Sequence, residues 1–134
     1  MRLWHQKLIP HLPRQQLLGQ YRECCALRGA GWGRKHSVVN YVFTHSPTYL
    51  ISYHFLIMDE MKKRGYNPDE TWYIPDYRGT KLGEDVGWSS HLELFNIADE
   101  IKNKQRIIYP EHNDAYLQEC LDNLKGKGIC IDLN

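Results

Sequence analysis

The segment from Ser46 to Gly65 constrains the fold of this chain more than any other feature. Ser46 is a residue type that caps helices, and Pro47 suits the first position of a helix. Lys62-Lys63-Arg64 before Gly65 supplies the cations and the glycine of a helix C-terminus. Between these ends, mostly apolar side chains recur at helical spacing: Leu50, Ile51, His54, Phe55, Ile57, Met58 and Met61. We predict a helix here that forms the central rod of the core.

The same reasoning predicts helices over about residues 13–28, 90–103 and 113–125. Residues 66–89 mix prolines and glycines with aromatic residues and are expected to form an ordered loop, while residues 129–131 could be a short strand or an extended cap. The predicted fold class is therefore mainly α, with three to four helices and long ordered loops. A length of 134 residues suits one compact domain spanning residues 1–134.

Composition narrows the classes of protein further. No apolar run approaches the ~20 residues of a membrane span, and the N-terminal residues lead into Pro10 and Pro13 rather than into a signal-peptide core. The four cysteines include the adjacent Cys24 and Cys25, which suit no ordinary disulfide framework and are expected to be free thiols. We therefore expect a cytoplasmic, monomeric protein that does not associate with membranes.

The formal net charge of +1 hides a strong asymmetry. Residues 1–45 carry seven basic side chains against one acid, Glu23, whereas residues 46–134 have a balance of −5. The basic residues of the first segment are Arg2, Lys7, Arg14, Arg22, Arg28, Arg34 and Lys35. A basic surface of this kind suits a polyanion such as nucleic acid, and a merely solvated basic face is an equally good interpretation of charge alone.

Glu23 stands out because it is the only acid among the first 58 residues. At helical spacing Gly19 shares its side, and a glycine inside a helix costs about 1 kcal/mol, which suggests that a ligand or another backbone approaches there. The neighbouring arginines are expected to favour the ionised form of Glu23, and a bound polyanion to disfavour it. Such a carboxylate is suited to exchanging protons.

These residues carry a family resemblance. The stretch Leu12-Pro-Arg-Gln-Gln-Leu-Leu-Gly-Gln-Tyr-Arg-Glu23 resembles the first helix of the pyrimidine-dimer DNA glycosylases, the endonuclease V enzymes of the bacteriophage type. The stretch from Tyr41 to Asn67, with its Lys63-Arg64-Gly65-Tyr66 ending, is similar to the second long helix of that family. The block through Asn40 also looks like that of short bacterial proteins grouped with the family. The resemblance covers about the first half of the chain.

The resemblance implies a compact helical repair enzyme that binds damaged double-stranded DNA and needs no metal or organic cofactor. In the family an N-terminal amine attacks C1′ of the damaged nucleotide and forms an imine, and a glutamate, here Glu23, handles protons before β-elimination cuts the strand. Here the amine is that of Met1. As a class, α-amines titrate near ~8 and lysines near ~10.4, so an α-amine is the better nucleophile at neutral pH.

Two positions depart from the family pattern. Position 2 is Arg2 where the family has a threonine, so the attacking amine moves to Met1, and Arg2 could serve a phosphate instead. Ala26 stands where the family has an arginine, and Arg28 could substitute for it. The catalytic candidates are thus Met1, Arg2 and Glu23. The candidates for DNA binding are Arg2, Arg22, Arg28, Arg34 and Lys35.

Other interpretations stay open at this point. His36, His45 and His54 recur every nine residues but match no compact zinc pattern, so no metal site is predicted. Cys24 could be a nucleophile, although its helical position favours buried packing. Trp32, between glycines, could stack on a base or pack in the core. The main alternative function is a non-catalytic nucleic-acid-binding domain on the same scaffold.

Overall fold

A computed structural model describes residues 1–35 and 38–134 of the chain. Four α-helices form its framework: α1 (Arg14–Arg28), α2 (Pro47–Lys63), α3 (His91–Lys104) and α4 (Asp114–Gly126). Three short 3-10 helices accompany them: η1 (Gln6–His11) precedes α1, η2 (Asn40–Thr44) lies between α1 and α2, and η3 (Glu70–Tyr73) lies between α2 and α3. The described residues contain no strand, only an isolated bridge between Tyr77 and Glu84. The prediction of a mainly α fold is confirmed.

The helix boundaries follow from local capping. The Ser46 side chain accepts a hydrogen bond from the Thr48 N–H at 3.1 Å, and Pro47 is the first residue of α2. Asn113 caps α4 in the same way. Residues 129–131 do not form a strand, and the Ile129 N–H donates to the Leu124 carbonyl at 3.0 Å, so the start of this tail caps the end of α4.

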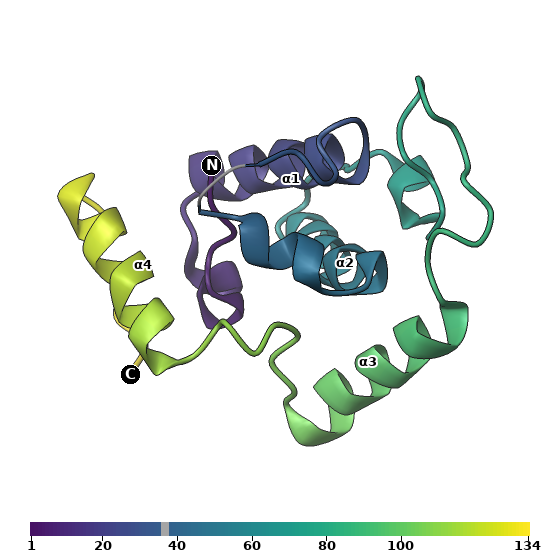
Figure 1. Ribbon diagram of the computed structural model, residues 1–134. Helices are drawn as coiled ribbons and strands as arrows, with labels where there is room; N and C mark the ends of the chain where they lie inside the picture. The colour runs from purple at the N-terminus through teal and green to yellow at the C-terminus, as the bar shows by residue number, and fades with distance from the viewer. Residues whose placement is uncertain (36–37) are drawn as a thin grey trace.

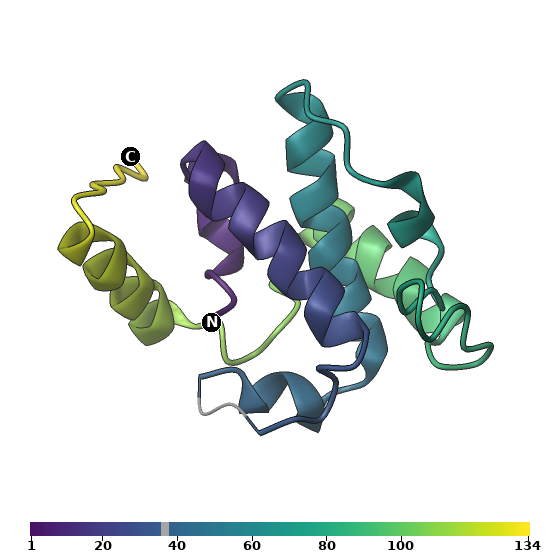
Figure 2. The same cartoon turned by 90° about the horizontal axis from the view of Figure 1, so that it is seen from above.

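The helix α2 is the central rod of the fold. Nine of its residues are buried, among them Tyr53, His54 and Ile57. Seen from above, α1 crosses over α2, with α4 on one side and the loop that follows α2 on the other (Figure 2). The helix α3 packs on α2 away from α4 (Figure 1). Four residues of α1 are exposed, and we call the surface that they form the outer face of α1: Arg14, Gln15, Arg22 and Ala26.

No helix among the described residues is long and apolar enough to cross a membrane. Apolar side chains do stay exposed on α3, where Leu92 is 72% and Phe95 is 69% exposed.

Candidate active site at the N-terminus

Gln20, on the inner side of α1, holds the N-terminal segment in place. Its Nε2 donates to the Arg2 carbonyl at 2.9 Å, and its Oε1 accepts from the Trp4 N–H at 2.7 Å. The same Nε2 also lies 3.2 Å from Oε2 of Glu23. Gln20 is buried, so these hydrogen bonds are shielded from competing water. The backbone of residues 2–4 is thereby fixed alongside α1, one helical turn from Glu23.

Met1, Arg2 and Glu23, the three catalytic candidates, line one cavity of about 250 Å³. Asn123 and Lys127 complete its wall from the end of α4. Trp4 and Val38 supply the remaining lining. Sequence reasoning brought the first three residues together through the family resemblance. It missed Asn123 and Lys127, since nothing in the local sequence relates the end of α4 to Glu23. It also missed Gln20, whose role depends on contacts with the N-terminal segment.

The environment of Glu23 is half-buried and positively charged. Burial raises the pKa of its carboxyl above the ordinary value, while the N-terminal ammonium, Lys127 and Arg22 act in the opposite direction. A hydrogen bond from the Arg2 backbone N–H also favours the ionised form. Arg22 thus favours the ionised form as expected, but the loss of water on burial outweighs the cationic neighbours. A carboxyl with a raised pKa beside an amine is suited to receiving and returning a proton.

The Arg2 side chain turns away from Glu23 toward α4. Its Nη1 lies 3.7 Å from Oε2 of Glu119, and its guanidinium lies 5.9 Å from the ring centres of both Trp4 and Tyr116. The side chain is 17% exposed. Arg2 thus lines the cavity, and its side chain also packs α4 against the N-terminal segment.

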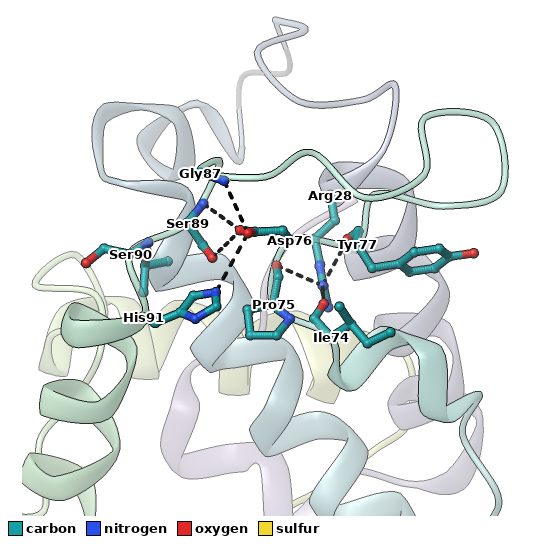
Figure 3. Close-up of polar contacts among 10 residues, drawn as sticks. Arg28, Ile74, Pro75, Asp76, Tyr77, Gly87, Ser89, Ser90 and His91 are labelled. Carbon is teal, nitrogen blue, oxygen red and sulfur yellow. Dashed lines mark hydrogen bonds and ion pairs between the residues drawn. The ribbon is translucent and has the colours of Figure 1, made fainter.

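Arg28 is fully buried at the C-terminal end of α1. Its guanidinium donates to the carbonyls of Trp72 at 2.7 Å, Ile74 at 2.9 Å and Tyr77 at 3.0 Å, and Nη1 lies 3.0 Å from Nδ1 of His54. Figure 3 shows Arg28 among Ile74, Pro75 and Tyr77. Burial lowers its pKa to about 10, so it remains charged at neutral pH. Arg28 is a structural residue that shapes the loop after η3. Its complete burial opposes the expected contact with DNA and the expected substitution for the family's arginine.

Three other basic candidates remain accessible. Arg22 is exposed on α1 next to Glu23, and Arg34 and Lys35 are exposed in the segment after α1. At Gly19 an added Cβ would lie 3.9 Å from Nη2 of Arg22 and within 4 Å of no other described segment. No other described segment therefore covers α1 at Gly19, and Arg22 places a positive charge next to Glu23.

The remaining candidates pack inside the protein. Cys24 is buried, and burial raises its pKa well above the ordinary value, which opposes a nucleophilic role. Trp32 makes edge contacts with Phe43 and Trp88 at ring-centre distances of 5.0 and 5.4 Å, so the core interpretation is the better one.

The histidines do not converge on a metal site within the described parts of the chain. His45 pairs with Glu111 at 2.9 Å, and His54 is buried against Arg28. His36 lies outside the described residues. No group of three or more potential ligands is found among residues 1–35 and 38–134.

Comparison with known proteins adds to this geometry. A family model described as pyrimidine dimer DNA glycosylase matches residues 1–74, more than half of the chain. The chain belongs to the pyrimidine dimer DNA glycosylase family. Comparisons with curated proteins and with solved structures gave no match.

Membership in the pyrimidine dimer DNA glycosylase family supports a repair function of the glycosylase kind. The matched residues run from the N-terminus through η3 and include Gln20 and Glu23. The helices α3 and α4 lie beyond the match. The cavity therefore combines family-matched residues with Asn123 and Lys127 from an unmatched part of the chain.

Proposed function

We propose that this chain is a DNA glycosylase with abasic-site lyase activity, acting on damaged double-stranded DNA without a cofactor. The observation that carries the proposal is that the N-terminal ammonium and Glu23 share one small cavity, close enough for the amine's charge to act on the carboxyl. The neutral amine of Met1 is the nucleophile, and Glu23 is the group that takes up and returns protons.

The proposed reaction forms an imine between Met1 and C1′ and then cuts the strand by β-elimination. The Met1 amine attacks C1′, and the glycosidic bond breaks with its electron pair going to the base. The nitrogen loses a proton to Glu23, and ring opening of the sugar leaves a protonated imine between C1′ and the enzyme. Loss of a proton from C2′ then expels the 3′ phosphate and cuts the strand. Water releases the enzyme amine from the imine.

Access to the base requires local unstacking of the duplex, which costs a few kcal/mol and is least costly at a distorted lesion. We assign phosphate contacts around such a site to Arg22, Arg34 and Lys35, because all three basic side chains are exposed. Arg2, with its side chain packed toward Glu119, contributes mainly through the backbone N–H that faces Glu23.

A second candidate function is a non-catalytic DNA-binding domain on the same scaffold. It is favoured by Arg2, which stands where the family has a threonine and whose side chain packs α4 against the N-terminal segment. In that case the cavity would bind a damaged nucleotide without forming an imine.

Borohydride trapping distinguishes the two functions. The full chain is incubated with a duplex carrying an abasic site, reduced, and analysed by intact mass and peptide mapping. We expect an adduct on the N-terminal peptide, lost when the amine is acetylated. An adduct on Lys7 or Lys35 would assign the amine to another residue. Salt-sensitive binding without any adduct would favour the non-catalytic domain.

A further inference from the structure

A tight reversal of the chain projects from the loop between η3 and α3, beyond the family-matched residues (Figure 1). The Arg78 N–H donates to the Gly83 carbonyl at 2.9 Å, and the Gly83 N–H donates to the Gly79 carbonyl at 2.7 Å. Both glycines have positive φ, +97° and +64°, which other residues rarely adopt. We call residues 79–83 the glycine turn. Its backbone conformation is well defined.

Arg78 fastens the base of the glycine turn to the end of α1. Its Nε donates to the Arg28 carbonyl at 2.9 Å, and its Nη2 donates to the Gly29 carbonyl at 3.2 Å. Its guanidinium also pairs with Asp85 at 3.1 Å and lies 4.3 Å from the Trp88 ring centre. These contacts fix the base of the turn to α1, whereas Lys81 and Leu82 at its tip are exposed.

The tip of the glycine turn carries an apolar and a basic side chain. Leu82 is 45% exposed, and Lys81 beside it is exposed as well. Both line a groove of about 460 Å³ between the turn and the end of α1. Small residues form the floor of this groove: Ala26, Gly29, Ala30 and Gly31.

The groove continues the face that contains the candidate active site. Ala26 lines the groove and Glu23 lines the cavity, and residues three apart are neighbours on a helix surface, with a rise of about 4.5 Å along the axis. Arg22 is exposed one helical turn before Ala26 and directly precedes Glu23. A duplex lying along the outer face of α1 would therefore meet both the cavity and the glycine turn.

We propose that the glycine turn is a second DNA-contacting element, in which Leu82 enters the duplex as an apolar wedge beside the damaged nucleotide and Lys81 binds a neighbouring phosphate. This inference rests on the proposed function, because it requires damaged duplex DNA as the ligand.

The chemistry of the turn fits this role. Proteins that kink DNA often insert an apolar side chain between base steps and recover the cost of unstacking through wider contact with the bent duplex. Such a wedge must be held rigidly, and Arg78 supplies that anchor. Asp69 also lines the groove, and its negative charge disfavours a phosphate beside it, so we assign the phosphate contact to the exposed Lys81.

The test measures binding and unstacking without chemistry. The probe is a duplex containing a tetrahydrofuran abasic analogue with 2-aminopurine in the neighbouring position, whose fluorescence rises on unstacking. We expect the full chain to raise the fluorescence, and Leu82→Ala to abolish the rise and weaken binding about tenfold. Leu82→Met should retain most of the fluorescence rise and most of the affinity. Lys81→Ala should lower the magnitude of the salt slope of log K by about 1.

Val86→Ala is the matched control, because Val86 is 86% exposed in the same loop but does not line the groove. It should behave like the unmodified chain. If Leu82→Ala binds and unstacks the duplex as well as the unmodified chain does, the wedge proposal is overturned and the proposed function stands. A chain that binds no duplex at all would overturn the proposed function together with it.

Discussion

Tyr53 donates a hydrogen bond to the side-chain oxygen of Gln20 at 2.9 Å and so joins α2 to α1 directly beneath the N-terminal segment. The same hydroxyl lies 2.7 Å from the Trp4 carbonyl. Both side chains are buried. The position of the N-terminal amine is therefore set by the two central helices rather than by the terminal residues themselves.

Gln20→Ala should reduce both stability and imine formation. The substitution leaves the Trp4 N–H without its acceptor and removes the donor to the Arg2 carbonyl, and each unsatisfied buried group costs about 1–3 kcal/mol. Urea unfolding and borohydride trapping measure the two effects. Gln15→Ala, at an exposed position of the same helix, is the control and should change neither. Equal trapping rates for Gln20→Ala and the unmodified chain would contradict the positioning role.

Glu23→Gln should separate binding from catalysis. The amide keeps the shape and hydrogen bonding of the side chain but cannot exchange protons. Strand cutting should fall by about 10² to 10⁴, the usual contribution of a positioned acid or base. Duplex affinity should stay the same or increase, since a negative charge near phosphates is removed. Cutting of abasic-site DNA at the unmodified rate would show that Glu23 has no such role.

Lys127→Gln should move the acid limb of the pH–rate profile to higher pH. The positive charges of the N-terminal ammonium, Lys127 and Arg22 oppose the effect of burial on the Glu23 pKa, so removing one of them lets that pKa rise further. The ionised form is then lost at a higher pH. Lys125→Gln, in the last turn of the same helix, is the matched control because Lys125 does not line the cavity. Identical profiles for both variants would exclude Lys127 from the site.

Substitution by alanine should change the stability of the fold at Arg28 and the affinity for DNA at Arg22. Arg28→Ala removes the donors to several carbonyls of the loop after η3 and should destabilise the fold by at least ~3 kcal/mol. Arg22→Ala should leave stability nearly unchanged and lower the magnitude of the salt slope of DNA binding by about 1. Thermal unfolding and binding titrations at several salt concentrations measure both. A smaller salt slope in a folded Arg28→Ala variant would restore Arg28 as a phosphate contact.

His112 should make the fold sensitive to acid. Burial lowers its pKa to about 3, with its Nδ1 accepting from the Gln6 N–H and its Nε2 lying 2.7 Å from the Tyr41 hydroxyl. In the unfolded chain this histidine binds a proton below about pH 6.5, whereas in the folded chain it does so only near pH 3. The free energy of unfolding should therefore decrease by up to ~1.4 kcal/mol per pH unit as the pH falls from about 6.5 to 3. His112→Gln should flatten this dependence in urea unfolding. His11→Gln, at an exposed position, should keep the full slope.

Local signals made the main helices predictable. The Ser46-Pro47 start and the apolar spacing that follows it lie within one segment, and the observed α2 begins and ends within two residues of the predicted helix. The 3-10 helices η1 and η2 were not predicted, because they are short and depend on contacts from elsewhere. Gln6, in η1, donates to the Arg106 carbonyl, about 100 residues away.

The errors at the site have a common physical cause. Arg28 was placed at the surface because charged side chains are seldom fully buried, but the carbonyls of the loop after η3 surround its guanidinium. Lys127 was missed because its closeness to Glu23 comes from how α4 docks, which no short-range pattern encodes. The Met1–Glu23 pair was expected only through the family resemblance, and its catalytic role stays a prediction.

The docking of α4 on the N-terminal segment also sets when the cavity can form during synthesis. Tyr116 donates to the Leu3 carbonyl, and Lys127 and Asn123 close the wall around Glu23. A nascent chain still short of Lys127 has the amine and the carboxylate but not this wall. The chain must therefore extend beyond Lys127 and leave the ribosome before Met1 has its complete surroundings, so the cavity is assembled only once α4 has docked on the N-terminal segment.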